Sequence, residues 1–161
     1  MCGVALNREK ALTIIDYFEQ PQERQEHWKN EIAKGDWRAA KFLYEQLQNN
    51  NVKARYGETT RLLLLTEADE LLAFCDFAEK DEIETDLTPW IGFVYTFPKH
   101  RGQRYSQKLI NHALNLAKAD GHRQVYISSN EVGLYEKYGF RPLQKMKDVW
   151  GGETQVFVYE L

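Results

Sequence analysis

The segment Arg101 to Ser106, with the sequence Arg-Gly-Gln-Arg-Tyr-Ser, has the residue types and spacing that best suit phosphate binding in this chain. It lies between an apolar run, Trp90 to Phe97, and a helix-like run, Ser106 to Asp120. A glycine-bearing turn that leads into a helix presents unpaired backbone N–H groups, and the helix dipole adds partial positive charge there. Lys99 and the two arginines add formal charge. The segment therefore predicts a phosphate site, although many strand-turn-helix connections with one glycine bind nothing.

A second segment, Leu134 to Phe140, follows the strand-like run Gln124 to Ser129 and is typical of a short helix ended by Gly139 at its C′ position. Together the two segments resemble the GNAT superfamily of N-acetyltransferases. The first matches the usual Arg-Gly opening of the family's pyrophosphate loop, and the second matches the helix whose tyrosine faces the coenzyme sulfur. The resemblance covers Trp90 to Phe140 well and extends loosely to the C-terminus.

The resemblance implies acetyl-coenzyme A as the acyl donor, with its pyrophosphate on the backbone N–H groups of the loop. The strand Ile91 to Tyr95 would hydrogen-bond the pantetheine arm. Arg104 stands where the family usually has glycine, so its guanidinium is expected to reach a phosphate instead. The family's asparagine usually precedes the tyrosine by seven residues, whereas Asn130 precedes Tyr135 by five. The candidate coenzyme-binding residues are Phe93, Val94, Tyr95, Arg101, Gly102, Gln103, Arg104, Tyr105, Ser106, Gln107 and Asn130.

Tyr135 is the candidate general acid for the thiolate that leaves when an amine attacks the acetyl group. A tyrosine with an ordinary pKa of about 10 is protonated at neutral pH, whereas a thiol has a pKa of about 8.5. The alternative is a core ring with a hydrogen-bonded hydroxyl. An attacking ammonium must also lose a proton, and Asp76 and Glu79, at the end of an expected central strand, are the candidate bases.

The carboxylates that follow, from Asp81 to Asp86, form an acidic run that either attracts a cationic acceptor or is an ordinary solvated loop.

Composition excludes several classes of protein. At 161 residues and 43% hydrophobic content, the chain is expected to form one domain over residues 1–161. A net charge of −3 argues against a broad nucleic-acid-binding surface. The sequence has no run long enough to span a membrane, and residues 1–7 are too short for a secretory signal, so a cytoplasmic location is expected. Four histidines and two cysteines, without ligand spacing, predict no metal site.

Hydrophobic periodicity predicts an α+β fold. Helices are expected near Ala11 to Phe18, over Gln22 to Lys34, and from Trp37 to Leu47. Gly35 should end the second of these helices, and Asp36 should be the N-cap of the third. The predicted strands are Gly3 to Asn7, Arg61 to Thr66, Leu71 to Ala78, Trp90 to Phe97, Gln124 to Ser129, and a tight hairpin in which Lys147 to Trp150 and Gln155 to Tyr159 flank Gly151-Gly152. The helix from Ser106 should return the chain so that the strands at Trp90 and Gln124 pair in parallel. A mixed, largely antiparallel sheet with one parallel pair and helices on both faces follows.

The leading functional hypothesis is an N-acetyltransferase that moves an acetyl group from acetyl-coenzyme A to a primary amine by direct transfer within a ternary complex. The acceptor could be cationic. The alternative is a GNAT-like module that binds acyl-coenzyme A as a sensor without turning it over. The C-terminal hairpin offers an edge through which a homodimer could form.

Overall fold

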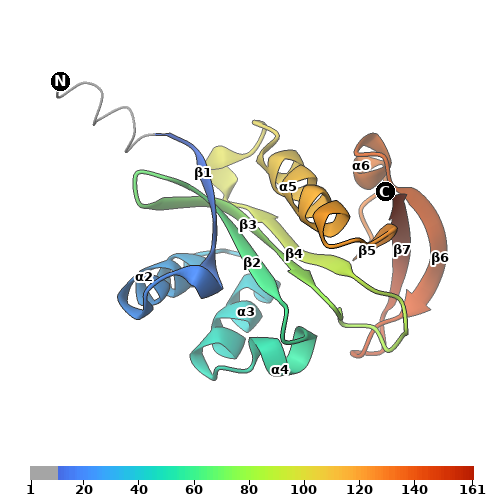
Figure 1. Ribbon diagram of the computed structural model, residues 1–161, viewed down its shortest axis with the longest axis horizontal. Helices are drawn as coiled ribbons and strands as arrows, with labels where there is room; N and C mark the ends of the chain where they lie inside the picture. The colour runs from blue at the N-terminus through green and yellow to red at the C-terminus, as the bar shows by residue number, and fades with distance from the viewer. Residues whose placement is uncertain (1–10) are drawn as a thin grey trace.

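A seven-stranded sheet forms the centre of the computed structural model, which describes residues 11–161 (Figure 1). The strand order is β1-β2-β3-β4-β5-β7-β6, and only β4 and β5 are parallel. The predicted largely antiparallel sheet with one parallel pair is therefore confirmed. The strands are β1 (Thr13–Asp16), β2 (Arg61–Glu67), β3 (Glu70–Ala78), β4 (Trp90–Thr96), β5 (Gln124–Ser129), β6 (Arg141–Lys147) and β7 (Glu153–Glu160).

Helices cover both faces of the sheet, as predicted (Figure 1). One face carries α2 (Gln22–Ala33), α3 (Arg38–Gln48) and α4 (Val52–Tyr56), whereas α5 (Tyr105–Ala119) and α6 (Leu134–Lys137) lie on the other. Two 3₁₀ turns, η1 (Tyr17–Glu19) and η2 (Pro98–His100), complete the described elements. Successive strand side chains point to opposite faces, so Leu62 and Leu64 pack against the first helix group and Leu63 and Leu65 against α5. A strand buried on both faces is apolar throughout, which explains the leucine run of β2.

β4 and β5 separate soon after they pair. Their parallel register has only two pairs, Trp90 with Tyr126 and Ile91 with Ile127. Beyond Ile91, β4 keeps its partner β3 on one side, while β5 diverges on the other. In the same stretch β4 contains a bulge, because Phe93 and Val94 together oppose the single residue Cys75, and Phe93 has a positive φ of 48°. A bulge takes backbone groups out of the regular ladder, so the opening between the strands is bordered by irregular backbone.

The prediction of a helix near Ala11 to Phe18 is wrong. Thr13–Asp16 forms β1, which pairs antiparallel with β2, and Tyr17–Glu19 forms η1. Ile14 and Ile15 pack into the cores on opposite faces of the sheet, and such adjacent β-branched residues suit a strand that alternates between two covered faces. The helix α4 was not predicted, and the predicted strand Gly3 to Asn7 lies outside the described residues.

Asp36 is not the N-cap of α3, because Trp37 occupies that position without a side-chain capping bond. The Tyr95 hydroxyl instead donates to the Asp36 carboxylate and accepts a hydrogen bond from the Asp36 backbone N–H at 3.1 Å. Trp37 stacks on the Tyr95 ring, with centroids 5.4 Å apart. These contacts attach the turn between α2 and α3 to β4, so the N-terminal helices help to shape the opening beside that strand.

The C-terminal hairpin is broader than predicted. β6 begins at Arg141, so Lys147 to Trp150 is not a strand, and the turn comprises the five residues from Asp148 to Gly152. The Asp148 carboxylate accepts hydrogen bonds from the N–H groups of Trp150 and Gly152, both at 2.9 Å, which stabilises this wider loop. No described helix is long and apolar enough to cross a membrane.

Candidate active site

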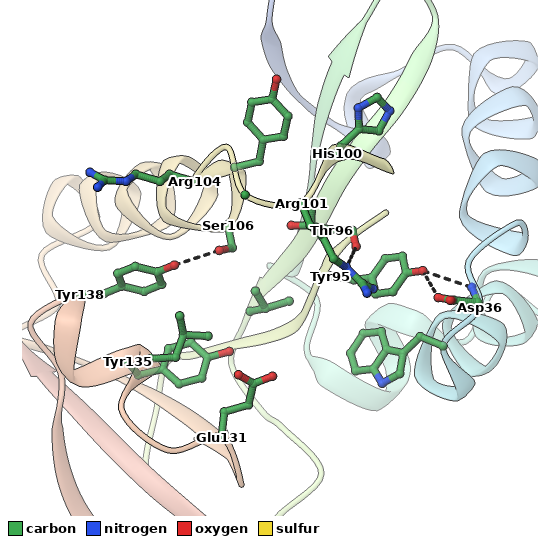
Figure 2. Close-up of a pocket in the computed structure, with 15 residues that line it drawn as sticks. Asp36, Tyr95, Thr96, His100, Arg101, Arg104, Ser106, Glu131, Tyr135 and Tyr138 are labelled. Carbon is green, nitrogen blue, oxygen red and sulfur yellow. Dashed lines mark hydrogen bonds between the residues drawn. The ribbon is translucent and has the colours of Figure 1, made fainter. Parts of the chain in front are cut away.

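A pocket of about 700 Å³ lies where β4 and β5 separate, between the start of α5, helix α6 and the α2–α3 turn (Figure 2). The segments that form it are far apart in the sequence and meet because the sheet opens there. Its lining residues are Asp36, Trp37, Val94, Tyr95, Thr96, His100, Arg101, Gly102, Arg104, Tyr105, Ser106, Glu131, Leu134, Tyr135 and Tyr138.

The glycine loop presents backbone donors to this pocket. The first helical bond after the loop runs from the Lys108 N–H to the Arg104 carbonyl at 3.2 Å, so the N–H groups of Tyr105, Ser106 and Gln107 precede the helical ladder. The Arg101 Nε donates to the Thr96 carbonyl at 2.9 Å, which fixes the loop to the end of β4. The positive helix end and these free donors form a site suited to an anion.

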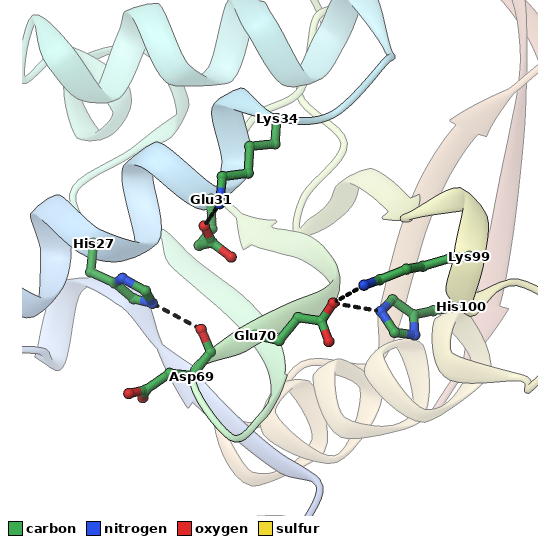
Figure 3. Close-up of polar contacts among 7 residues, drawn as sticks. All are labelled: His27, Glu31, Lys34, Asp69, Glu70, Lys99 and His100. Carbon is green, nitrogen blue, oxygen red and sulfur yellow. Dashed lines mark hydrogen bonds and ion pairs between the residues drawn. The ribbon is translucent and has the colours of Figure 1, made fainter.

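Lys99 does not add its charge to the loop, contrary to expectation. Its Nζ pairs with Glu70 Oε2 at 2.6 Å, and the His100 Nε2 lies 3.2 Å from the same oxygen (Figure 3). The hydrogen bond from Lys99 lowers the pKa of Glu70. These contacts attach η2 to the β2–β3 turn, so Lys99 supports the loop from outside the pocket.

Arg104 has a backbone conformation that glycine adopts more readily than other residues. Its φ is 60° and its ψ is 31°, in the left-handed region, two residues after Gly102 at a φ of 87°. A left-handed conformation costs roughly 1 to 2 kcal/mol for a residue other than glycine. In Figure 2 its side chain extends along α5, away from Arg101. Within residues 11–161 its guanidinium makes no hydrogen bond or ion pair, so it is free to take an anionic partner.

Tyr135 lies on α6 at the inner wall of the pocket and is only 6% exposed. A Schellman motif ends this helix, because the Phe140 N–H donates to the Tyr135 carbonyl and the Gly139 N–H to the Glu136 carbonyl. This confirms the predicted role of Gly139, whose φ is 95°. Burial raises the pKa of Tyr135 far above its ordinary value, so the hydroxyl stays protonated. Figure 2 shows that hydroxyl and the Glu131 carboxylate turned toward the same part of the pocket.

A second pocket, of about 310 Å³, continues from the first on the other side of the opening. The two share Trp37, Val94, Glu131 and Tyr135. The Tyr135 side chain therefore borders both spaces, where a ligand in one pocket could react with a ligand in the other. The second pocket is lined by Trp37, Ala39, Asp81, Glu82, Gly92, Phe93, Val94, Ile127, Ser128, Ser129, Glu131, Tyr135, Asp148, Trp150 and Thr154.

Asp81 is the most perturbed carboxyl of the second pocket. Burial raises its pKa from 3.8 to about 6, although the Ser128 hydroxyl donates to its Oδ2 at 2.9 Å and opposes this shift. The carboxyl of Asp76 approaches the same point, since a Cβ at Gly92 would lie 2.8 Å from Asp76 Oδ1 and 2.9 Å from Asp81 Oδ1. Burial, followed by the charge of Asp81, raises the pKa of Asp76 well above its ordinary value. Glycine at position 92 thus allows two carboxyls to converge beneath the pocket.

The other candidate base, Glu79, lies outside both pockets. Its carboxylate accepts hydrogen bonds from the Thr59 hydroxyl at 2.7 Å and the Thr59 N–H at 3.2 Å, and these contacts lower its pKa. Asp76 is 3% exposed and lines neither pocket. Among the carboxylates that line the second pocket, Asp81 has the raised pKa, and the sequence predicts it only as part of the acidic run.

The structure brings most of the candidate coenzyme residues together. The first pocket is lined by Val94, Tyr95, Arg101, Gly102, Arg104, Tyr105 and Ser106. Phe93 lines only the second pocket, and Gln103 and Gln107 line neither. The Asn130 amide donates to the Glu153 carbonyl at 3.3 Å and lies outside both pockets. Sequence reasoning missed Glu131, Trp37 and Trp150, because no local motif marks them and only the fold brings them to the opening.

Comparison with known proteins gives the family. Residues 16–140 match the model of the Acetyltransferase (GNAT) family. None of the curated proteins matches the sequence. Among solved structures, the chain is similar to a GNAT family acetyltransferase from Elizabethkingia anophelis with acetyl-CoA bound, at 16% identity and a TM-score of 0.63 over 93% of this chain and 98% of that chain.

It is also similar to the Escherichia coli GNAT family N-acetyltransferase YhbS in complex with CoA, at 18% identity and a TM-score of 0.65 over 94% of this chain and 82% of that chain. Escherichia coli ElaA is 19% identical, with a TM-score of 0.61 over 94% and 99% of the two chains. The solved structures match the fold, and the family model matches more than half of the sequence. The chain therefore belongs to the GNAT family of acetyltransferases.

Proposed function

We propose that the protein transfers an acetyl group from acetyl-coenzyme A to a primary amine, directly and within a ternary complex. The observation that carries this proposal is the meeting of two pockets at Tyr135 and Val94, where β4 and β5 separate. Direct transfer requires both substrates at once, with the reacting atoms held close together. Two relatives of similar fold that have acetyl-CoA or CoA bound support the choice of donor.

The first pocket would hold the donor. Its pyrophosphate suits the free N–H groups at the start of α5. The pantetheine arm is an extended chain of amides, and the β4 edge beyond Ile91 has no strand partner on the β5 side within the described residues. Such an edge can accept an extended ligand as an added strand. This arrangement would bring the thioester toward Val94 and Tyr135.

The second pocket would hold the acceptor. The amine arrives as an ammonium with a pKa near 10, so it must lose a proton before its lone pair can attack. We propose Asp81 as the base, since it is the carboxyl of raised pKa that lines this pocket. The nitrogen then forms a bond to the acetyl carbon, the carbon–sulfur bond breaks, and the thiolate takes the proton of the Tyr135 hydroxyl. The acylated nitrogen then loses its second proton, which restores the Tyr135 hydroxyl, and Asp81 returns the first proton to solvent.

Acetyl-coenzyme A and a panel of primary amines, with release of free thiol as the readout, test this function. Amine-dependent thiol release that yields the acetylated amine is the expected result. Isothermal titration calorimetry with coenzyme A provides an independent measure of donor binding. Coenzyme binding without turnover of any amine would instead support the acyl-coenzyme A sensor, and the absence of both would exclude both functions.

Arg104→Gly should change stability and coenzyme affinity in opposite directions. Glycine adopts the left-handed conformation without strain, so we expect the free energy of unfolding to rise by roughly 1 kcal/mol. If the guanidinium turns to the pyrophosphate on binding, its loss removes a charged contact worth about 1.5 to 3 kcal/mol, or a roughly 10- to 150-fold increase in Kd. Chemical denaturation and calorimetry measure the two effects.

Arg104→Ala is the matched control, because it removes the guanidinium and keeps the strained backbone. It should weaken coenzyme A binding as much as Arg104→Gly does, without the gain in stability. Pantetheine, which has no pyrophosphate, should bind all three proteins equally. Unchanged coenzyme A affinity in both variants would show that Arg104 contributes nothing to phosphate binding.

A further inference from the structure

The second pocket joins an aromatic wall to a group of carboxylates. Trp37 and Trp150 contribute indole rings from opposite ends of the sequence, and Phe93 adds a ring from the β4 bulge. Trp37 stacks on Tyr95, so its plane is fixed. Carboxylates come from Asp81, Glu82, Glu131 and Asp148. None of the described residues that line the pocket is a lysine or an arginine.

Two of the four carboxylates are already used within the protein. Arg55 donates to both oxygens of Glu82, at 3.0 and 2.6 Å, and the Tyr56 hydroxyl donates to Glu82 as well. Asp148 accepts the two N–H groups that shape the β6–β7 loop. These two groups stabilise the walls of the pocket, so they are poorly placed to bind a cation.

Asp81 and Glu131 are the carboxylates left for a ligand. The only side-chain donor to the Asp81 carboxylate within residues 11–161 is the Ser128 hydroxyl. The Glu131 carboxylate makes no hydrogen bond or ion pair within residues 11–161, and Figure 2 shows it directed to the same space as the Tyr135 hydroxyl. An ammonium group bound between Asp81 and Glu131 would therefore lie beside Tyr135, where the acyl group is expected.

Trp150 forms part of the wall of the second pocket, although most of its side chain is not buried in the core. It is 65% exposed, yet its ring packs edge-on against Phe42 at 5.6 Å, and the Arg55 guanidinium lies 5.5 Å from its centroid. These contacts orient an indole whose free surface borders the pocket. Exposed aromatic rings that are held in place in this way are typical of ligand contacts, because a bound apolar group removes their surface from water.

The pocket volume of about 310 Å³ is at the small end of the range for ligand sites. It suits one ring on a short chain, and it is small for a polycyclic antibiotic. A linear polyamine would find too few free carboxylates for its several charges and would leave the aromatic wall uncovered. The aromatic wall and the free carboxylates therefore both favour a small amine that carries one ring.

We propose that the acceptor is a small arylalkylamine, whose ammonium lies at Asp81 and Glu131 and whose ring packs against Trp150 and Trp37. This inference names the substrate class of the proposed acetyl transfer and rests on that function. The reaction is unchanged, in that the amine nitrogen gains the acetyl group and its proton passes to Asp81.

Matched amines test the inference in two ways. The first measures kcat/KM for 2-phenylethylamine, n-butylamine, spermidine and a lysine-containing peptide. We expect 2-phenylethylamine to be preferred to n-butylamine by roughly tenfold, because its ring adds apolar and aromatic contact. The second measures binding of 2-phenylethylamine and of the uncharged 2-phenylethanol by calorimetry with coenzyme A present. Only the amine should bind well.

Trp150→Ala should lower kcat/KM for 2-phenylethylamine by about tenfold, with little effect on n-butylamine and none on coenzyme A affinity. Leu143→Ala is the control, because Leu143 is also partly exposed and lines neither pocket. Efficient acetylation of spermidine or the peptide in preference to the arylalkylamine would overturn the inference and leave acetyl transfer intact. Failure of 2-phenylethylamine to bind the coenzyme complex would also overturn it. Binding without acetylation of any amine would support the pocket assignment and refute the transferase.

Discussion

Tyr135→Phe is expected to lower kcat for acetyl transfer by about 10² to 10⁴, the usual contribution of a positioned proton donor. The substitution deletes one hydroxyl and keeps the ring, which packs near Phe157 with centroids 5.8 Å apart. Fold and coenzyme affinity should therefore change little. The loss is smaller if water also protonates the leaving thiolate. Steady-state rates of thiol release by both proteins, with calorimetry for coenzyme A, measure the two quantities.

Tyr138→Phe is the matched control for this experiment. Tyr138 lies on the same side of the sheet and lines the first pocket, but its hydroxyl is 3.1 Å from Ser106 Oγ at the loop end. Losing that hydrogen bond should affect donor binding more than kcat. Equal rates for Tyr135→Phe and the unmodified protein would remove Tyr135 from the mechanism. Equal losses for the two variants would indicate a structural effect of α6 instead of proton donation.

The parts of the fold that follow a local pattern could be predicted from the sequence. Examples are the glycine before α5, the glycine after α6 and the apolar residues of β2 to β5. Each of these features can be recognised within a short, continuous stretch of sequence. β1 could not be identified, because four residues fit a helical and a strand period equally well. The strand conformation follows from antiparallel pairing with β2, which the local sequence does not show. The Gly151-Gly152 pair suggested a tight hairpin because glycine favours such turns, whereas the Asp148 carboxylate stabilises a longer loop.

The lining of the first pocket could largely be predicted from the sequence, whereas that of the second pocket could not. A strand-loop-helix junction leaves a compact motif in the sequence, and seven of the residues predicted from it line the first pocket. The second pocket combines Trp37, Asp81, Glu131 and Trp150, which only the sheet and the C-terminal hairpin bring together. Asp76 and Glu79 were predicted as bases because they lie at the end of a strand. Asp76 is fully enclosed, and the Glu79 carboxylate is bound to Thr59.

Asp81→Asn should lower kcat/KM for the amine by about 10² to 10⁴, because an amide cannot accept the ammonium proton. In the unmodified protein this parameter should rise with pH through about 6, as the Asp81 carboxyl ionises. The carboxyls that line the pocket with Asp81 or converge with it are Asp76, Glu82, Glu131 and Asp148, and the guanidinium of Arg55 is bound to Glu82. The rise near pH 6 should be absent in the variant, while Glu79→Gln keeps the normal rate and profile.

The same substitution should increase stability at neutral pH. The folded protein binds a proton at Asp81 more tightly than the unfolded chain does, because the pKa is about 6 against an ordinary 3.8. The free energy of unfolding therefore falls as pH rises through this interval, and above pH 6 the ionised group costs on the order of 1 to 3 kcal/mol. Asparagine avoids this cost and can still accept from Ser128. The loss of stability begins near the ordinary pKa of 3.8 and is complete above pH 6, so urea unfolding at pH 8 should show roughly twice the gain seen at pH 5. An equal gain at both would mean that Asp81 is not held at a raised pKa. A variant that is more stable and also inactive would indicate that the fold tolerates an unfavourable, partly buried charge because the reaction needs a base there.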